Sequence, residues 1–189
     1  MLGLPVNANI PMISVISRLV SHKGIDIVAE AAENLLYNNI QLVILGKGDR
    51  DYEMFFENLQ HRYPDKVVAY IAFEPKIAKK IYAASDMFLM PSKSEPCGLA
   101  QMIASRYGTV PIVRETGGLR DSIHDCTLGE GNGFTFVDYT ADNISNAVNR
   151  ALHLYYDKKN WNNLIAEVMN TDFSWNNSAA EYLKMYRSL

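Results

Sequence analysis

The sequence predicts an α/β fold: a doubly wound, Rossmann-like parallel sheet of about six strands with helices on both faces. Two observations carry this prediction. Short apolar runs rich in β-branched residues alternate with longer amphipathic segments along the 189 residues. The apolar runs are continuous, as expected for strands that are buried on both faces of a parallel sheet. Right-handed crossovers between such strands leave few other topologies.

The six expected strands are followed by loops that contain polar residues or glycine. They are IPMISVIS (10–17), IQLVILG (40–46), KVVAYIAF (66–73), DMFLM (86–90), TVPIVRE (109–115) and GFTFVD (133–138).

The segments between these runs have the spacing of amphipathic helices. In 25–38, for example, Ile25, Val28, Ala32 and Leu35 fall on one helical face. A further helix is expected from about Asp49, with Tyr52, Phe55, Phe56 and Leu59 pointing inward. Two more are expected near 75–85, with Ile77 and Ile81, and from about Gly98, with Leu99, Met102 and Ile103. The remaining expected helices are the short segment 119–123 and the segments 141–156, 158–169 and roughly 175–187.

Composition limits the classes of function. The formal net charge of −3 gives no electrostatic case for nucleic acid as a partner. No apolar run approaches the ~18 residues of a membrane helix, and no basic segment precedes an apolar one as in a signal peptide. We therefore expect a soluble cytoplasmic domain without a membrane partner, in which the sequons at Asn143 and Asn176 are chance matches.

The cysteines and histidines predict no metal site. Cys97 and Cys126 make no disulfide framework, and the histidines are scattered at positions 22, 61, 124 and 153. A reducing compartment is the simplest setting for two unpaired thiols.

Two cations follow the first expected strand, where ligands of such sheets bind. Arg18 and Lys23 lie in SRLVSHKG, next to backbone N–H groups at the start of a helix. A planar guanidinium and a compact ammonium suit a diphosphate. Surface cations are also common in loops, and spacing alone gives the two readings equal weight.

Glycine turns follow the second and fifth strands. LGKGD, with Gly46, matches neither the P-loop nor the G-x-G-x-x-G spacing, so a sharp turn before Asp49 as an N-cap is the favoured reading. Thr116, Gly117 and Gly118 form a second place where backbone can approach phosphate. Taken alone, this segment is also better explained as a turn.

Three further residues each have a functional and a structural reading. Glu95 in SEPCGL can accept hydrogen bonds from hydroxyl groups or cap the following helix, and the two readings are equal. Phe73 can stack on a base, although an aromatic there is more often core. Cys97 resembles a nucleophile only weakly, because free cysteines usually pack. Asp138 is expected to cap the helix at 141.

Each signal is weak alone, but all of them fall at the carboxyl ends of strands. The coincidence of cations, an acid and glycine turns on one rim favours a negatively charged, hydroxyl-rich ligand such as a nucleotide-sugar.

Several motifs resemble those of the bacterial glycogen synthases and plant starch synthases. They are SRLVSHKGIDIV, LGKGD, YAASDMFLMPSKSEPCGLAQMIASRYGTVPIVRETGGLRDSI and GNGFTFVDYTADNI. The resemblance runs from about Gly3 to the terminal DFSWNNSAAEYLKMYRSL and concerns the C-terminal half of these enzymes. It implies a GT-B glycosyltransferase, in which the active site lies between two Rossmann-like domains. Residues 1–189 would be the single nucleotide-sugar-binding domain, with the helix at about 175–187 packing toward an N-terminal domain that these residues do not include.

The resemblance also implies the chemistry. Such enzymes move glucose from ADP-glucose to the non-reducing end of an α-1,4-glucan, with retention, release of ADP, and no metal or other cofactor. Arg18 and Lys23 would hold the diphosphate, and Glu95 would contact the donor glucose. The remaining donor contacts would come from Gly46, Phe73 on the adenine, Cys97, Gly98 and Leu99 through their backbone, Ala100, and Thr116, Gly117 and Gly118 near the sugar.

The sequence departs from the family pattern at three positions. Lys93 and Ser94 replace an arginine and an aromatic that often precede EPCGL, and Ala100 replaces a threonine whose hydroxyl often contacts phosphate. Two alternatives stay open: a GT-B enzyme that uses UDP-glucose, or a non-catalytic nucleotide-binding module. A flavodoxin-like receiver needs an acidic cluster after its first strand, where SRLVSHKG has cations.

Overall fold

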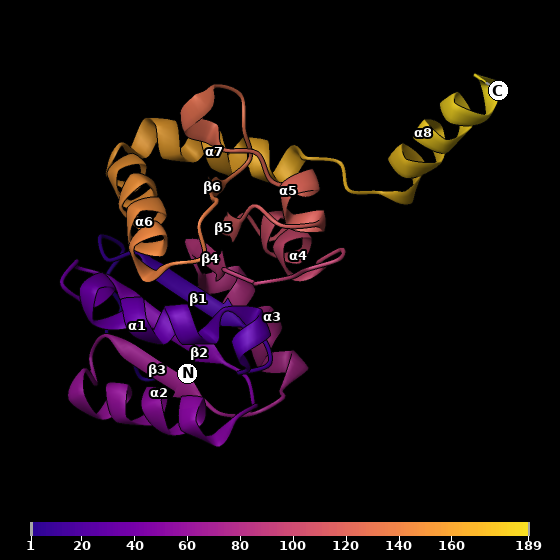
Figure 1. Ribbon diagram of the computed structural model, residues 1–189. Helices are drawn as coiled ribbons and strands as arrows, with labels where there is room; N and C mark the ends of the chain where they lie inside the picture. The colour runs from indigo at the N-terminus through magenta and orange to yellow at the C-terminus, as the bar shows by residue number, and fades with distance from the viewer. Residues whose placement is uncertain (1, 189) are drawn as a thin grey trace.

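Six parallel strands form one sheet in the order β3-β2-β1-β4-β5-β6 in the computed structural model, which describes residues 2–188 (Figure 1). The order reverses between β1 and β4. These two strands pair with each other; β2 and β3 follow on the side of β1, and β5 and β6 follow on the side of β4. This is the position of the ligand crevice in doubly wound folds. The strands are β1 (Met12–Ile16), β2 (Gln41–Leu45), β3 (Val67–Tyr70), β4 (Met87–Met90), β5 (Val110–Arg114) and β6 (Phe134–Phe136).

Every predicted strand and helix is present, so the predicted fold class is confirmed. The strands are shorter than the apolar runs, because the last residues of runs such as 66–73 belong to the loops. The helices are α1 (Ile25–Leu36), α2 (Arg50–Arg62), α3 (Pro75–Ala84), α4 (Ala100–Arg106), α5 (Gly118–Ser122), α6 (Ala141–Tyr156), α7 (Lys158–Asn170) and α8 (Trp175–Arg187), with 3-10 turns η1 (Ser21–Lys23) and η2 (Cys126–Leu128).

Helices cover both faces of the sheet. On one face α1 lies between α2 and α6, and on the other α3 and α4 lie side by side. Ile13 and Val15 belong to the large apolar cluster with α1 and α6, whereas Val43 and Leu45 pack in a second cluster with Ile81 of α3. Burial of both faces explains why the strand residues are almost uniformly apolar.

The buried face of helix α4 is not the face that carries the large apolar residues of this segment. Gln101, Ala104 and Ser105 are buried, while Leu99 and Ile103 are exposed. Small and amide-bearing side chains allow α4 to pack closely on the sheet and α7, so the larger apolar residues point outward.

The predicted cap of α6 is wrong. Thr140, and not Asp138, is the N-cap residue, and its Oγ1 accepts a hydrogen bond from the Asn143 N–H at 3.2 Å. Asp138 lies two residues before the cap, outside the usual reach of a capping side chain. At α2 the N-cap residue is Asp49 as predicted, but its side chain makes no capping bond; instead the Gly48 N–H donates to Glu53.

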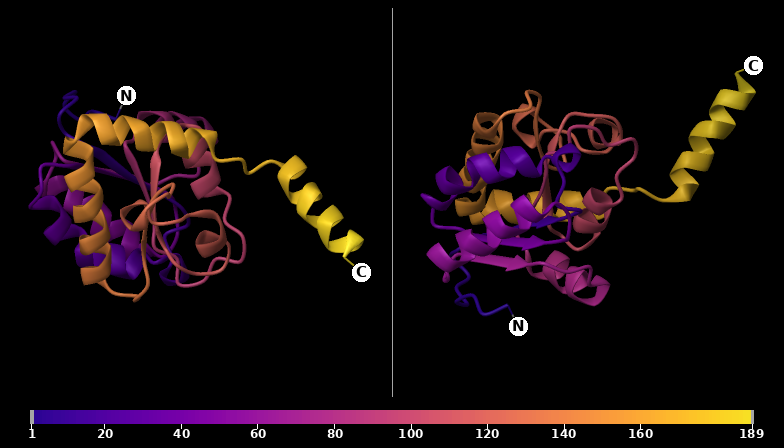
Figure 2. Two further views of the ribbon diagram at one scale, coloured as in Figure 1. Left: turned by 90° about the horizontal axis from the view of Figure 1, so that it is seen from above. Right: turned by 60° about the horizontal axis from the view of Figure 1, so that its bottom comes forward.

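Helix α8 extends away from the rest of the chain on the segment 171–174, as two further views show (Figure 2). None of its described residues is buried, and it exposes Trp175, Tyr182, Leu183 and Tyr186. A helix with so much exposed aromatic surface is typical of an interface.

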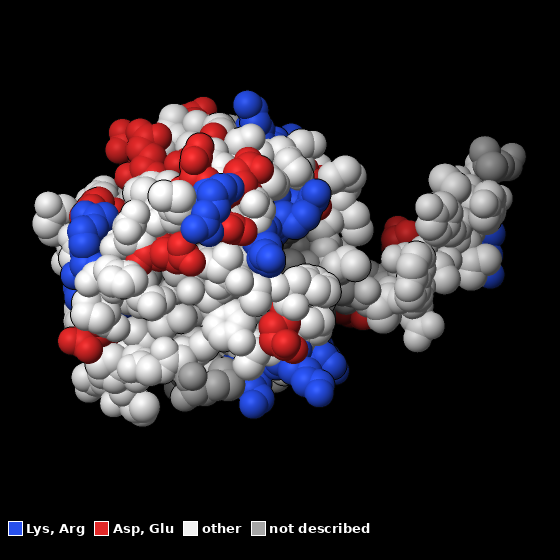
Figure 3. Space-filling view, turned by 90° about the horizontal axis from the view of Figure 1, so that it is seen from below, with Lys and Arg blue, Asp and Glu red and all other residues white. Residues whose placement is uncertain are grey.

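Two further properties of the described residues are the absence of a membrane-spanning helix and the distribution of surface charge. None of the helices within 2–188 is both long and apolar enough to span a bilayer. Acidic and basic side chains lie interspersed on the face shown in Figure 3, in keeping with the near balance of 18 basic and 21 acidic residues.

Candidate functional site

A pocket of about 240 Å³ lies at the carboxyl ends of β1 and β4, where the strand order reverses. It brings together residues from the loops after β1 and β4, which are distant in the sequence. Six of the predicted site residues line it: Arg18, Lys23, Glu95, Gly98, Leu99 and Ala100. These six residues therefore lie together on one rim of the sheet.

The centre of the pocket is an ion pair between Lys23 and Glu95. Lys23 Nζ lies 2.5 Å from Glu95 Oε2, and the two side chains are 20% and 10% exposed. The Ser92 hydroxyl donates to the same carboxylate oxygen at 3.2 Å. Glu95 is therefore held by two donors and does not cap α4, which begins at Ala100.

Gly24 allows the loop after β1 to meet the loop after β4. It ends η1 with a φ of +79°, and a side chain there would overlap the backbone of Pro91. Only glycine combines that backbone conformation with such a close approach. Lys23 is thus brought beside Glu95 by the residue that follows it.

Arg18 lies at the open side of the pocket and is exposed. Its Nη2 is 3.1 Å from Nε2 of His22, and among residues 2–188 no carboxylate forms an ion pair with it. Two cations and one carboxylate leave a net positive site at this edge. Such a site favours an anionic ligand.

The Thr116-Gly117-Gly118 turn packs against the backbone of the Glu95 loop. The Gly118 N–H donates to the Glu95 carbonyl at 3.0 Å, and Gly117 has a φ of +45°. Side chains on Gly117 and Gly118 would overlap the carbonyl oxygens of Glu95 and Cys97, respectively. This turn therefore approaches the backbone of another loop, and the contact orients Glu95.

Gln101, which no sequence motif indicated, donates hydrogen bonds that hold the loop of Glu95 and Gly98. Its side chain is fully buried, and Nε2 donates to the Gly98 carbonyl at 2.8 Å and to the Ser122 hydroxyl at 3.1 Å. Its Oε1 is buried without a partner within residues 2–188. Cys97, one residue before Gly98, is exposed. Neither Gln101 nor Ser92 carries a local signal in sequence, because their roles depend on contacts between loops.

Six predicted residues do not line this pocket: Gly46, Phe73, Cys97, Thr116, Gly117 and Gly118. Gly46 is buried and packs against the carbonyl of Ser17, so it serves the packing of neighbouring loops. Phe73 is 86% exposed and lines an adjacent, mostly apolar pocket of about 440 Å³ with Ile16, Tyr82 and Tyr107. The alternative that Phe73 is a core residue is wrong.

The described residues contain no group of three His, Cys, Asp or Glu side chains placed to hold a metal ion. The charged groups of the pocket are instead an arginine, a lysine and a single glutamate.

Comparison with known proteins gives a consistent picture. The family described as glycosyl transferases group 1 matches residues 4–167. A glycogen synthase of Clostridium botulinum (strain Eklund 17B / Type B) is 55% identical over 190 residues, which cover 100% of this chain and 40% of the relative. A glycogen synthase of Kosmotoga olearia is 53% identical, with 98% of this chain and 39% of the relative covered.

Solved structures agree in fold. The catalytic domain of starch synthase IV from Arabidopsis thaliana, bound to ADP and acarbose, matches with a TM-score of 0.89 and 37% identity, over 99% of this chain and 40% of that chain. A sucrose-phosphate synthase from Thermosynechococcus elongatus has a TM-score of 0.70 and 23% identity, over 97% of this chain and 46% of that one, and supports the fold alone. The chain thus spans about 40% of the length of the curated relatives it matches.

Proposed function

The chain belongs to the group 1 family of glycosyl transferases, and we propose that it is the C-terminal, donor-binding domain of a retaining glucosyltransferase of the glycogen synthase type. The donor is ADP-glucose, and the acceptor is the non-reducing end of an α-1,4-glucan. The observation that carries this proposal is the arrangement of Arg18, Lys23 and Glu95 in one pocket at the reversal of strand order. The 55% identity to a glycogen synthase supports the choice of reaction.

The two cations suit the leaving group. When the bond from glucose to the diphosphate breaks, negative charge develops on the diphosphate while the sugar becomes oxocarbenium-like. Arg18 and Lys23 stabilise that charge, and because they are already in place they act more strongly on the transition state than on the ground state. Removing one such donor typically costs roughly 3–4 kcal/mol of the barrier.

Glu95 suits the sugar. Its carboxylate faces the same pocket as the cations and accepts hydrogen bonds already from Lys23 and Ser92. Hydroxyl groups of the donor glucose can use its remaining acceptor positions. The exposed ring of Phe73, in the adjacent apolar pocket, gives the adenine a surface for stacking. Backbone groups from Cys97 to Ala100, with the turn at Thr116, Gly117 and Gly118, complete the donor contacts.

The acceptor lies outside these residues. The chain spans about 40% of its glycogen synthase relatives, and we propose that an N-terminal domain supplies the acceptor site and closes over the pocket. The aromatic surface of α8 is the part of this chain that packs toward it. The reaction uses no cofactor, since the diphosphate charge is neutralised by side chains, and it takes place in the cytoplasm.

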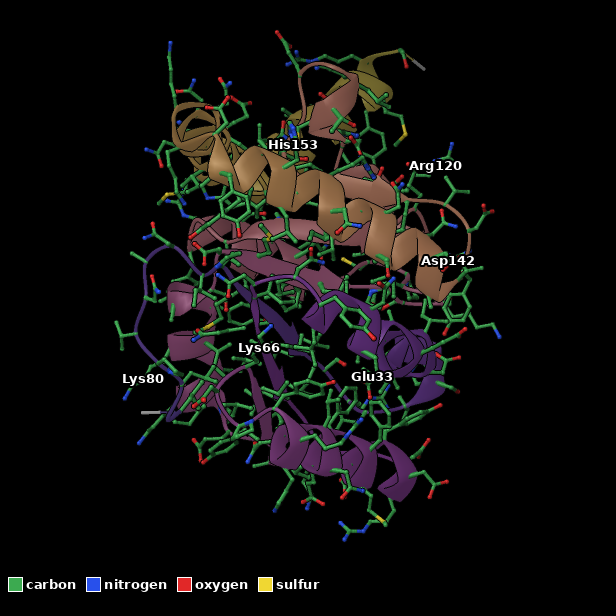
Figure 4. All side chains as sticks on the ribbon, turned by 90° about the vertical axis from the view of Figure 1, so that its left-hand side faces the viewer. Glu33, Lys66, Lys80, Arg120, Asp142 and His153 are labelled. Atoms are coloured by element: carbon green, nitrogen blue, oxygen red, sulfur yellow. The ribbon has the colours of Figure 1, made fainter. Side chains whose placement is uncertain are left out.

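A calorimetric titration tests the donor site. ADP-glucose and ADP are titrated into the wild-type chain and into Arg18→Ala, with UDP-glucose as competing donor. We expect ADP-glucose to bind more tightly than UDP-glucose, and Arg18→Ala to lose most of the affinity. Lys80→Ala is the matched control, because Lys80 is an exposed cation on α3 that does not line the pocket. It lies on the opposite side of the molecule from Asp142, which marks the start of α6 at the carboxyl edge of the sheet (Figure 4).

Two results contradict parts of the proposal. Equal ADP affinity of the wild-type chain and Arg18→Ala overturns the diphosphate assignment. Tighter binding of UDP-glucose than of ADP-glucose assigns the chain to a different donor within the same family.

A further inference from the structure

Tyr139, in the loop between β6 and α6, contacts the loops that carry Lys23 and Glu95. It is half-buried, and none of the motif arguments singled it out. Its hydroxyl points to Ser21 and Asp26, and its ring lies against Lys93 in the loop after β4 and Arg114 at the end of β5. The residue therefore links the segment after β1, the loop after β4 and the end of β5.

The hydroxyl holds the start of α1 and the turn before it. Tyr139 Oη lies 2.5 Å from Asp26 Oδ1 and 3.0 Å from the Ser21 carbonyl oxygen. The single hydroxyl proton is shared between these two acceptors, with the nearer carboxylate favoured. Ser21 and Asp26 lie on either side of Lys23, so this contact restrains the segment from which the lysine side chain extends.

The hydroxyl remains a donor over the usual pH range. Burial, followed by the hydrogen bond to Asp26, raises the pKa of Tyr139 well above its ordinary value. The contact is therefore present whenever the protein is folded near neutral pH.

The ring of Tyr139 holds the loop that leads to Glu95. Lys93 Nζ and Arg114 Cζ lie 5.5 and 5.4 Å from the ring centroid, within the range of cation–π attraction. Arg114 also donates to the carbonyl of Lys93 at 3.0 Å. The Lys93 N–H in turn donates to the carbonyl of His22 at 3.0 Å, next to Lys23.

We infer that Tyr139 is a positioning residue of the donor site: it fixes the loop of Lys23 and the loop of Glu95 relative to each other, without contacting the donor itself. The inference rests on the proposed function for its consequence on nucleotide binding. Without the hydroxyl, the Lys23 segment loses its restraint while Lys93 and Arg114 can still rest on the ring. Binding of a diphosphate must then order that segment, which weakens affinity.

Two measurements test the inference on the full chain. The first is calorimetric titration of ADP into the wild type, Tyr139→Phe, Lys23→Ala and the double variant. Tyr139→Phe should weaken ADP binding by about five- to tenfold, as expected for one net hydrogen bond. In the double variant the loss should equal that of Lys23→Ala alone within about twofold, since Tyr139 acts through Lys23.

The second measurement needs no nucleotide. Hydrogen exchange of the Lys23 and Lys93 amides, which donate to Val20 and His22, should be faster in Tyr139→Phe. Tyr63→Phe is the matched control, because the Tyr63 hydroxyl likewise donates to a carboxylate, that of Glu33, at 2.8 Å, and neither residue lines the pocket. It should change neither the exchange of these two amides nor ADP affinity.

The outcomes separate the two claims. Unchanged exchange at both amides in Tyr139→Phe overturns the positioning role. Unchanged ADP affinity, or losses that multiply in the double variant, overturns its action through Lys23. If the wild-type chain binds no ADP, the proposed function fails, whereas the exchange result still decides the positioning role.

Discussion

Lys23 and Glu95 are 72 positions apart in the sequence, yet Lys23 Nζ lies 2.5 Å from Glu95 Oε2 in a pocket that largely shields both side chains. Removal of either partner leaves the other charge partly buried and uncompensated. An incoming diphosphate competes with Glu95 for the lysine, so the two residues should have opposite effects on binding of the nucleotide alone.

We predict that Lys23→Ala and Glu95→Gln separate nucleotide binding from sugar binding. Lys23→Ala should weaken ADP binding by about 10- to 100-fold, the range for a lost charge-assisted hydrogen bond. Glu95→Gln should bind ADP as tightly as the wild type or more tightly, because the lysine no longer has an anionic partner. It should lose the additional affinity for ADP-glucose. Calorimetry with both ligands measures this, and a Glu95→Gln variant that loses as much ADP affinity as Lys23→Ala would contradict the assignment.

Gly117→Ala should destabilise the fold. Its φ of +45° is strained for alanine, and the new methyl group would overlap the Glu95 carbonyl oxygen. We expect the free energy of unfolding in urea to fall by about 2–3 kcal/mol. Gly3→Ala is the matched control, because Gly3 has a φ of +84° with no neighbour within 4 Å. It should lose only about 1 kcal/mol, the conformational cost. Equal losses in the two variants would show that the contact with the Glu95 loop contributes nothing.

Acid stability should depend on Asp125. Burial acts to raise the pKa of its carboxyl group, but hydrogen bonds from Arg150, Thr127 and Thr135 outweigh burial and lower that pKa. The ionised group therefore stabilises the fold above its unfolded pKa of about 4, and this contribution is lost as the pH falls through the lowered value. In urea titrations, Asp125→Asn should be less stable than the wild type at pH 7, and the difference should shrink below pH 4.

Asp86 gives the opposite pH dependence and serves as the control. Burial raises the pKa of Asp86, even though the Met12 N–H donates to its carboxylate at 2.8 Å. Its ionisation therefore opposes folding as the pH rises above about 4. The stability of Asp86→Asn relative to the wild type should increase between pH 4 and pH 7. A parallel response of the two variants would contradict the assignment whose predicted direction it lacks.

The two thiols should differ in reactivity. Cys97 is exposed, whereas burial, followed by the nearby Asp125 charge, raises the pKa of Cys126 to about 11. Because the thiolate is the reactive form, iodoacetamide at pH 8 should label Cys97 first, and ADP-glucose should slow that labelling. Mass spectrometry of the labelled peptides measures both rates, with Cys97→Ser as the control. Faster labelling of Cys126 would contradict the placement of these thiols.

Residues 1–189 alone should transfer little or no glucose, although they bind the nucleotide weakly. The proposed acceptor site lies outside them, and without it the oxocarbenium-like state is open to water on one side. Incorporation of labelled glucose from ADP-glucose into glycogen measures the activity. Turnover close to that of a full-length glycogen synthase would overturn the division of the active site between two domains.

The sequence predicts the six strands, their parallel arrangement and the loops that form the rim, because each depends on local patterning and on the handedness of crossovers. It also predicts six of the fourteen residues that line the pocket. It does not predict the roles of Ser92, Gln101 and Tyr139, whose side chains resemble ordinary loop or helix residues until the loops are brought together. The wrong cap at Asp138 has a related cause, since the helix start is defined by backbone geometry to within one or two residues.

By itself the sequence determines that Arg18, Lys23, Glu95 and the glycine turns follow strands of one parallel sheet, since hydrophobic periodicity is a local property of the chain. Only the tertiary structure decides which of them meet. The strand order β3-β2-β1-β4-β5-β6 makes β1 the neighbour of β4, and this pairing brings Lys23 to Glu95. The pairing of β4 with β5 brings the Gly117 turn to the Glu95 loop, and Tyr139, after β6, contacts the segments on both sides of Lys23. Those contacts depend on strand order and on close backbone approach at glycines, which no local pattern encodes.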